Sequence, residues 1–293
     1  MRVLLLGARG QLGVELAPLL ARWGDVTAWR RDQLDLSDVA QVRRQIEAFA
    51  PDLLVNAAAY TAVDRAESEA DLALRVNGDA VREMAQAMAE CGGAMLHYST
   101  DYVFDGTASR PWREEDAVAP LNRYGDSKLA GENFLREALA DHLILRTSWL
   151  YSHHGTNFLR TILRLTKERE ELRIVSDQVG APTWARHVAQ VTCQVLERWL
   201  AVPDRSRDAG VYHLSAAGEV SWCGFAEEIL RLKHGGELPP RPRLCPITTS
   251  EYPTPARRPT YSVLSNAKLR RVFGIQPVQW RASLRECMSL LCD

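Results

Sequence analysis

Three side chains suited to carbonyl reduction lie in one central part of the chain. Tyr124 and Lys128 are four residues apart in a segment with helical periodicity, so they share one helix face. A phenol has an ordinary pKa of about 10, and a neighbouring ammonium lowers it toward the range useful for acid catalysis. Thr100 follows an apolar strand and can hydrogen-bond the same substrate oxygen. We therefore predict Thr100, Tyr124 and Lys128 as the catalytic residues of a ketone reductase. The alternative is a solvated Tyr–Lys pair without a function.

A glycine-rich turn near the start of the chain predicts a dinucleotide site. Gly7, Gly10 and Gly13 stand between an apolar run at residues 3–6 and a helical pattern that begins at Gln11. The spacing G-x-x-G-x-x-G differs from the usual G-x-G-x-x-G. The physical need is the same, because the chain must turn tightly and bring a pyrophosphate to backbone amides at a helix N-terminus. The alternative is a glycine turn without a ligand.

Charged residues after the second expected strand bear on the choice of nicotinamide cofactor. An acidic residue there favours NAD by binding the ribose 2′-hydroxyl, whereas arginine accommodates the 2′-phosphate of NADP. Arg30 and Arg31 are found there, and Arg9 lies inside the glycine loop. Asp32 and then Asp35 follow these arginines. We predict NADPH as the cofactor, while Asp32 keeps NADH possible.

Strand and helix patterns alternate through the first half, which predicts βαβ units and a parallel sheet. The expected strands cover residues 3–6, 25–29, 52–57, 94–98, 142–146 and, later, 211–214. The expected helices cover residues 11–22, 37–49 with Ser37 as N-cap, 72–90, 123–140, 158–167, 185–200, 222–233, 266–273 and 281–291. Seven of the 14 prolines lie in residues 239–259, so we expect an extended loop there.

The predicted fold class is α/β, a Rossmann-type doubly wound parallel sheet with a smaller C-terminal α/β substrate lobe. Residues 1–150 are expected to form the dinucleotide-binding domain. Residues 151–293 are expected to form mainly the substrate-binding lobe, with some later segments returning to the first domain. The proline-rich segment 239–259 would then lie over the second half of the chain.

Composition excludes several classes of function. The net charge is −1, which gives no support for binding nucleic acid or a membrane surface. No apolar stretch is long enough to span a membrane, and the first apolar run is too short for a signal segment, so we expect a cytoplasmic protein. The six cysteines form no CxxC pair and are expected to be reduced. His153 and His154 are adjacent in the sequence, which is poor geometry for binding one metal ion together. We expect both histidines to lie in a solvated loop.

Several motifs together resemble the extended short-chain dehydrogenase/reductases and, within them, the dTDP-4-dehydrorhamnose reductase family. The most specific are the Gln-Leu-Gly of the glycine loop and the Thr-Asp-Tyr-Val-Phe-Asp-Gly turn at residues 100–106. Similar segments continue through Asn-Ala-Ala-Ala-Tyr at residues 56–60, Asp-Gln-Val-Gly-Ala-Pro-Thr at 177–183 and Arg-Arg-Pro at 257–259. The resemblance covers most of the chain. Related dehydratases carry Asp-Glu after this threonine, whereas Tyr102 follows Asp101 here, so the elimination machinery is missing.

The resemblance implies reduction of the C4 ketone of dTDP-4-dehydro-L-rhamnose to dTDP-L-rhamnose. It implies cofactor contacts from Gly7, Arg9, Gly10, Gln11, Leu12, Gly13, Arg30, Asp35, Leu36, Ala57, Ala58, Ala59, Tyr60, Tyr124 and Lys128. It implies contacts to the dTDP-sugar from Val63, Thr100, Asp101, Tyr102, Phe104, Trp149 and Arg258. A homodimer is possible. Some family members bind magnesium through C-terminal acids, but this C-terminal segment is poor in acids, so no metal is predicted.

Two other functions remain open at this point. Regulatory beta subunits of methionine adenosyltransferase share this fold and parts of the motifs without catalysing a reduction. Sugar-nucleotide 4-epimerases also share it, but they keep NAD bound and return the hydride to the sugar. The complete set of Thr100, Tyr124 and Lys128 favours catalysis over the first alternative.

Overall fold

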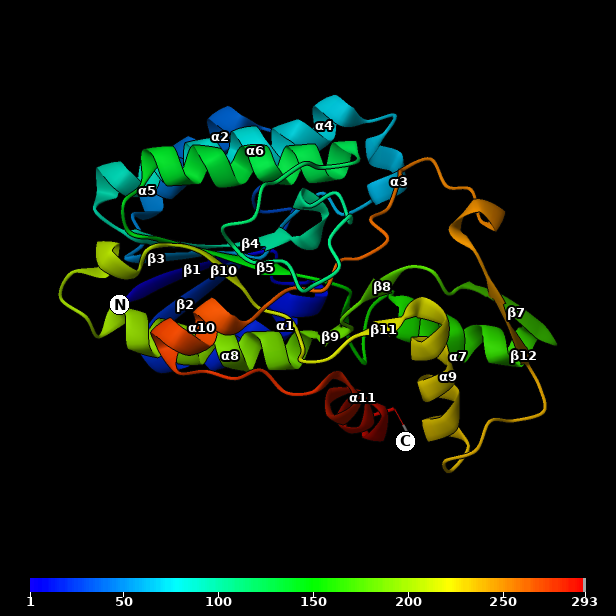
Figure 1. The fold of residues 1–293 in the computed structure, drawn as a ribbon. Helices are drawn as coiled ribbons and strands as arrows, with labels where there is room; N and C mark the ends of the chain where they lie inside the picture. Colours follow the sequence, from blue (N-terminus) through cyan, green and yellow to red (C-terminus); the bar gives the residue numbers. More distant parts are fainter. Residues whose placement is uncertain (292–293) are drawn as a thin grey trace.

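A parallel sheet forms the centre of the molecule in the computed structural model, which describes residues 1–291 (Figure 1). Its strand order is β10-β5-β4-β3-β1-β2, and every neighbouring pair is parallel. The strands are β1 (Arg2–Leu6), β2 (Asp25–Trp29), β3 (Leu53–Asn56), β4 (Ala94–Thr100), β5 (His142–Thr147) and β10 (Gly210–His213). The α/β fold class and the doubly wound sheet are therefore confirmed.

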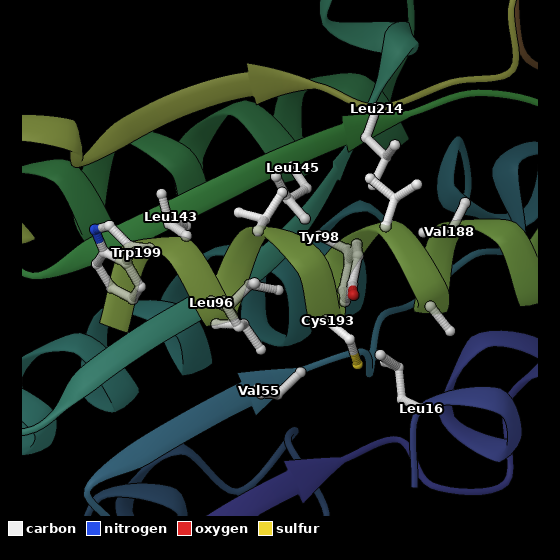
Figure 2. Packing of buried hydrophobic residues seen from close by; sticks show 14 of the residues in the cluster. Leu16, Val55, Leu96, Tyr98, Leu143, Leu145, Val188, Cys193, Trp199 and Leu214 are labelled. Atoms are coloured by element: carbon white, nitrogen blue, oxygen red, sulfur yellow. The ribbon is translucent and has the colours of Figure 1, made fainter. Parts of the chain in front are cut away.

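Helices cover both faces of this sheet because successive strand residues point to opposite sides. Leu4 and Leu54 face one helical layer, and Leu5 and Val55 face the other. The first layer contains α2 (Val39–Phe49), α5 (Ala80–Cys91) and α6 (Arg123–Ala138). The second layer contains α1 (Gln11–Leu20), α8 (Ala185–Leu200) and α10 (Ala267–Phe273), and Figure 2 shows α8 side chains packed on strand residues. Full burial of each such aliphatic side chain stabilises the fold by about 1.5–3 kcal/mol.

The later part of the chain builds a smaller lobe at the carboxyl end of the sheet (Figure 1). Its core is aromatic and aliphatic, with Trp184, Phe225 and Trp280 buried together. Its helices are α7 (Phe158–Glu168), α9 (Trp222–Lys233) and α11 (Trp280–Ser289). Its strand pairs are β6 (Leu150–Tyr151) with β9 (Thr183–Trp184), β7 (Glu171–Val175) with β12 (Arg243–Ile247), and β8 (Val179–Gly180) with β11 (Val220–Ser221). Within residues 1–291, no helix has both the length and the apolar character needed to cross a membrane.

The expected helix 72–90 is interrupted. It consists of α4 (Ala70–Leu74), a π-helical turn at Arg75–Asp79, and α5. The wider turn carries Asn77, whose side chain bonds the backbone N–H and carbonyl of Tyr60 and the hydroxyl of Ser127. π-Turns of this kind are frequent at functional sites. Here the turn anchors the loop after β3 to α6.

Three other expectations are wrong in detail. The N-cap of α2 is Asp38, which accepts from Gln41 N, because the carboxylate of Asp35 engages Ser37. Residues 239–259 are not one extended loop, since they contain β12 and a 3₁₀ turn at Thr249–Glu251. A proline is compatible with β12 because this strand pairs on one side only, with β7. The rings of His153 and His154 converge on one carboxylate despite their adjacency.

Candidate active site

A cavity of about 1290 Å³ opens at the carboxyl ends of the central strands. It lies where the chain order reverses between β1 and β3, the position at which doubly wound sheets bind ligands. Its size exceeds the range of about 300–1,000 Å³ that is typical for one drug-sized ligand, so a dinucleotide and a second molecule can share it. The predicted residues that line it are Gly7, Arg9, Gly10, Gln11, Leu12, Arg30, Asp35, Leu36, Ala57, Ala58, Ala59, Tyr60, Val63, Thr100, Asp101, Tyr102, Tyr124, Lys128 and Trp149.

The glycine loop has a geometry that only glycine permits. Gly7 has a φ of +79°, and a Cβ there would lie 2.7 Å from the backbone of Ala57 and Ala58. Gly13 does not line the cavity; a Cβ on it would lie 2.1 Å from Gly7 O, so this glycine lets α1 pack against the loop. The loop therefore brings the N-terminus of α1 to the cavity wall, where helix amides can bind a phosphate.

The charged residues after β2 line the far part of the cavity. The guanidinium of Arg30 lies 3.5 Å from Asp32, and that of Arg31 lies 3.4 Å from Asp35. Asp35 accepts hydrogen bonds from the backbone N–H and the hydroxyl of Ser37, which lower the pKa of its carboxyl. Asp35 is thus engaged in its own turn. Trp29, at the end of β2, also lines the cavity, and its aromatic side chain at a strand end was a signal that the sequence reading missed.

Thr100 and Tyr124 meet at the end of β4. The hydroxyl of Thr100 accepts from Tyr102 N at 3.2 Å and donates to Asp101 Oδ1 at 3.0 Å. Tyr124 lies in the first turn of α6, where the Asn122 side chain caps the helix by accepting from Gly125 N. The ring of Tyr124 packs edge-on against Tyr102, with centroids 5.6 Å apart.

The pKa of Tyr124 differs from the expectation. Burial raises the pKa of its phenol to about 12, and the hydrogen bond with Thr100 opposes that rise only in part. The predicted lowering by Lys128 is therefore wrong for this structure. The physical reason is that the ammonium of Lys128 is directed at the carbonyl of Tyr98, 2.7 Å away. A phenol with this pKa stays protonated at neutral pH, as a proton donor must.

Lys128 is almost completely buried, with 2% of its surface exposed. Its Nζ lies 3.1 Å from Nε2 of His97, and His97 Nδ1 lies 3.1 Å from the amide nitrogen of Asn56. Burial lowers the pKa of Lys128 to about 8, although Glu132 raises it. The sequence reading missed His97 and Asn56, but a signal existed, because His97 interrupts the apolar residues of β4 and Asn56 ends the apolar strand β3.

Asp101 is an acid held in a desolvated place. Only 2% of its surface is exposed, and burial raises the pKa of its carboxyl to about 7 against the hydrogen bonds from Ser262 and Thr100. In the part of the chain that the structure describes, its Oδ2 has no hydrogen-bond partner. This carboxyl is therefore partly protonated near neutral pH, directly beside Thr100.

Trp149 forms the wall between the two lobes. It has a φ of +46°, and its ring stacks on Trp222 from α9 with centroids 3.4 Å apart. A Cβ on Gly180 would lie 2.4 Å from the Trp149 ring, so position 180 has room only for glycine. Trp222 was not predicted, because its contact with Trp149 depends on how the second lobe packs.

Phe104 and Arg258 do not line the cavity. Phe104 is fully buried, and its ring stacks on Trp112 with centroids 4.5 Å apart, so it supports the turn from behind. Arg258 makes two hydrogen bonds to Asp64, at 2.8 and 3.1 Å, and a third to the carbonyl of Ala256. The guanidinium thereby joins the proline-rich segment to α3 (Val63–Ala66), at the edge of the cavity.

Comparison with known proteins places this site in a family. The model of the family described as RmlD substrate binding domain matches residues 1–292. A dTDP-4-dehydrorhamnose reductase from Burkholderia thailandensis is 49% identical, over 98% of this chain and 98% of its own length. This chain belongs to the dTDP-4-dehydrorhamnose reductase family.

Solved structures of dTDP-4-dehydrorhamnose reductases agree with this assignment. One from Clostridium acetobutylicum has a TM-score of 0.91 and 38% identity, and 99% of each chain is covered. Another from Bacillus anthracis, determined in complex with NADP, has a TM-score of 0.89 and 35% identity, with 99% of each chain covered. The resemblance inferred from the sequence motifs is therefore confirmed at the level of the family.

Proposed function

We propose that this member of the dTDP-4-dehydrorhamnose reductase family reduces the C4 ketone of dTDP-4-dehydro-L-rhamnose to give dTDP-L-rhamnose. The observation that carries the proposal is one continuous cavity, bounded by the glycine loop, Thr100, Tyr124 and Lys128. A ketone reductase needs this combination, because cofactor and carbonyl must meet beside a proton donor. The names of the relatives supply the substrate.

The catalytic roles follow from the chemistry of the three side chains. Bound NADPH supplies the hydride. Tyr124 is protonated at neutral pH and donates its proton to the carbonyl oxygen as that oxygen gains negative charge. Thr100 lies beside the phenol, and its hydroxyl would donate a second hydrogen bond to the same oxygen by turning its proton away from Asp101. Lys128 borders the same wall. Its Nζ would hold a ribose hydroxyl of bound NADPH.

For the cofactor, we propose NADPH, with NADH as a weaker substitute. The glycine loop fits a pyrophosphate, and Arg9, Arg30 and Arg31 line the cavity where a 2′-phosphate must be neutralised. A relative of known structure binds NADP. Small residues at Ala57 to Ala59 give a ligand close access to the backbone after β3.

The sugar half of the cavity is proposed to use Val63, Asp101, Tyr102 and Trp149, which line it. Phe104 contributes only by packing behind this wall. Arg258 is proposed to contact the pyrophosphate of the substrate. Until the substrate binds, Asp64 holds the guanidinium of Arg258 at the edge of the cavity. Most of residues 151–293 then serve the sugar site, while β10 completes the sheet of the first domain.

A coupled assay tests the function. The purified chain is mixed with dTDP-4-dehydro-6-deoxyglucose, the matching 3,5-epimerase and NADPH, and nicotinamide absorbance is followed. We expect stoichiometric oxidation of NADPH that requires the epimerase, together with dTDP-L-rhamnose as product. A regulatory subunit would leave the absorbance unchanged. A 4-epimerase would convert the sugar without net consumption of NADPH, and either result would reject the proposal.

Two coarser expectations remain. A homodimer is proposed, and a cytoplasmic location is proposed from the lack of a long apolar segment in the sequence. Light scattering and cell fractionation would test them. Sugar-nucleotide binding itself is measurable by calorimetry with dTDP, which carries the diphosphate that Arg258 would recognise.

A further inference from the structure

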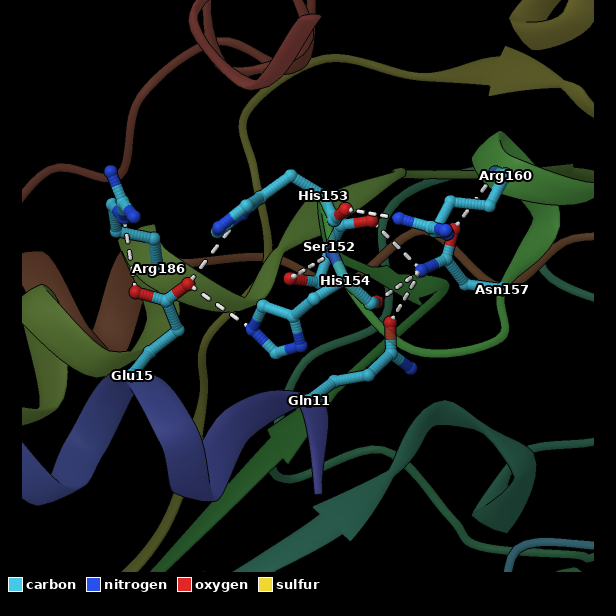
Figure 3. A network of polar contacts seen from close by, with 8 residues as sticks. All are labelled: Gln11, Glu15, Ser152, His153, His154, Asn157, Arg160 and Arg186. Carbon is cyan, nitrogen blue, oxygen red and sulfur yellow. Dashed lines mark hydrogen bonds and ion pairs between the residues drawn. The ribbon is translucent and has the colours of Figure 1, made fainter. Parts of the chain in front are cut away.

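Outside the active site, three potential metal ligands from two distant segments converge. Oε1 of Glu15, on α1, lies 3.6 Å from Nδ1 of His153 and 3.4 Å from Nε2 of His154 (Figure 3). The three ligand atoms lie within 4.8 Å of one another. Figure 3 shows the two imidazole rings approaching the same carboxylate oxygen from the loop after β6.

All three atoms are shielded from solvent, yet they lack hydrogen bonds. Among residues 1–291, Glu15 Oε1, His153 Nδ1 and His154 Nε2 have no hydrogen-bond partner. Glu15 is also 9% exposed, which is unusual for a carboxylate without full pairing. Three buried donor atoms that face one another without bonding indicate that a further atom belongs between them.

The spacing fits a metal ion better than a direct contact. A direct N–H···O hydrogen bond spans about 2.7–3.2 Å, which is shorter than both distances. Ligands about 2.0–2.2 Å from a tetrahedral zinc ion lie about 3.3–3.6 Å from one another. The two carboxylate–imidazole distances match this spacing, and the two imidazole nitrogens lie within 4.8 Å of each other.

Neighbouring side chains orient these ligands as a metal site requires. Arg186 donates to Oε2, the other oxygen of Glu15, at 3.0 Å, so Oε1 remains available. Arg160 donates to the carbonyl of His153 at 2.7 Å and holds the loop. Outer hydrogen bonds of this kind are a normal part of metal sites. The positive charge of Arg186 opposes the binding of any cation. The site therefore needs a metal with high affinity for imidazole nitrogen, which favours a transition metal over magnesium.

We propose that Glu15, His153 and His154 form a binding site for a divalent transition metal of the zinc class. Imidazole nitrogen with one carboxylate oxygen is a ligand set that suits zinc and excludes a preference for magnesium or calcium. Three protein ligands leave a fourth position for water. The site joins α1 to the loop at residues 152–157, and in that loop Asn157 donates to Gln11 on the wall of the cofactor cavity at 2.8 Å.

The experiment measures zinc binding to the full chain, without a polyhistidine tag and after treatment with a chelator. Titration with zinc chloride against a chromophoric chelator is expected to show one tight site per chain. Glu15→Gln and His154→Gln are each expected to weaken it at least tenfold. His187→Gln is the matched control, because His187 also contacts a carboxylate, that of Glu286 at 3.1 Å, but offers only one imidazole. The control is expected to bind zinc like the wild type.

Cobalt(II) supplies a readout of the ligands. The wild type is expected to give the intense visible bands of four-coordinate cobalt, and these should disappear in His153→Gln and His154→Gln. A thiolate charge-transfer band would assign the metal to a cysteine such as the exposed Cys91 and overturn the proposal. Absence of stoichiometric zinc binding in the wild type would overturn it too. So would wild-type affinity in folded Glu15→Gln and His154→Gln, checked by circular dichroism.

Discussion

Nζ of Lys128 lies 3.1 Å from Nε2 of His97, and the surrounding hydrogen bonds decide which atom carries the proton. Ala58 N donates to Asn56 Oδ1, so the amide N–H₂ of Asn56 faces His97 Nδ1. A neutral His97 then carries its proton on Nε2, toward Lys128. The N–H of His97 and the ammonium of Lys128 would then face each other as two donors, which disfavours the charged form of Lys128. Burial also disfavours the charged form and lowers the pKa of Lys128 to about 8.

The first prediction concerns His97 as a positioning residue. His97→Leu removes one of the two polar contacts of Lys128, and leaving a buried polar group without its partner costs about 1–3 kcal/mol. We expect kcat/KM for NADPH to fall roughly 10–100-fold. His213→Leu is the control, since His213 is equally buried on β10 but bonds the carbonyl of Trp112. Equal losses in both variants, measured well below their unfolding temperatures, would mean that only packing was affected.

Tyr124 is predicted to act as the proton donor. Tyr124→Phe should reduce turnover roughly 10²–10⁴-fold, the usual effect of removing a general acid. NADPH affinity, measured by fluorescence titration, should stay nearly unchanged because the ring remains in place. Tyr252→Phe, at a tyrosine that is 58% exposed, should behave as wild type. Turnover of Tyr124→Phe within a few-fold of wild type would remove this phenol from the mechanism.

Asp101 should make stability depend on pH. The pKa of its carboxyl is about 7 in the folded chain against an ordinary value of 3.8, so folding favours the protonated form. Its contribution to the free energy of unfolding therefore falls as pH rises from about 4 to 7. Asp101→Asn should gain roughly 2–3 kcal/mol more over wild type at pH 8 than at pH 5. Urea unfolding at the two pH values measures this, and a gain independent of pH would contradict it.

Arg258 can be tested against its partner Asp64. Arg258→Ala should weaken binding of the dTDP-sugar by about 1.5–3 kcal/mol, the scale of a charged hydrogen bond, and leave NADPH binding unchanged. Asp64→Asn breaks the same ion pair but keeps the guanidinium, so its Michaelis constant for the sugar should change less. If both variants lose the same affinity, the pair only holds the loop, and Arg258 is not a substrate contact.

Cofactor preference should depend on Arg30 and Arg31. Replacing both with alanine should raise the Michaelis constant for NADPH and spare that for NADH, because only NADPH carries the 2′-phosphate. The side chain of Arg31 is 81% exposed, so its loss should not affect folding. Arg44→Ala, an exposed arginine of α2 away from the cavity, is the control. An equal effect on both cofactors would show that these arginines do not bind the phosphate.

Local patterns in the sequence were enough for the framework. The limits of β2, α8 and α9 were predicted to the residue, because apolar periodicity records which face of an element is buried. The glycine loop was equally predictable, because the positive φ of Gly7 and the close contact between Gly13 and Gly7 both arise within a few residues of the chain. Tyr124 and Lys128 followed from helix spacing alone.

Other features depend on contacts between residues far apart in the chain. Phe104 follows Asp101 and Tyr102 in the sequence, yet its ring turns into the core against Trp112. Arg258 meets an aspartate 194 positions earlier, and Trp149 meets Trp222 from the other lobe. Periodicity carries no information on such pairs, because they depend on how the lobes pack.

The sequence by itself thus determined the parallel sheet, the nucleotide loop and the Tyr–Lys pair, all of which rest on interactions within a few residues. Only the tertiary structure decided the protonation states and the second site. Burial raises the pKa of Tyr124 and lowers that of Lys128, and burial is a property of the folded whole. The meeting of Glu15 with His153 and His154 likewise exists only because the loop after β6 folds onto α1.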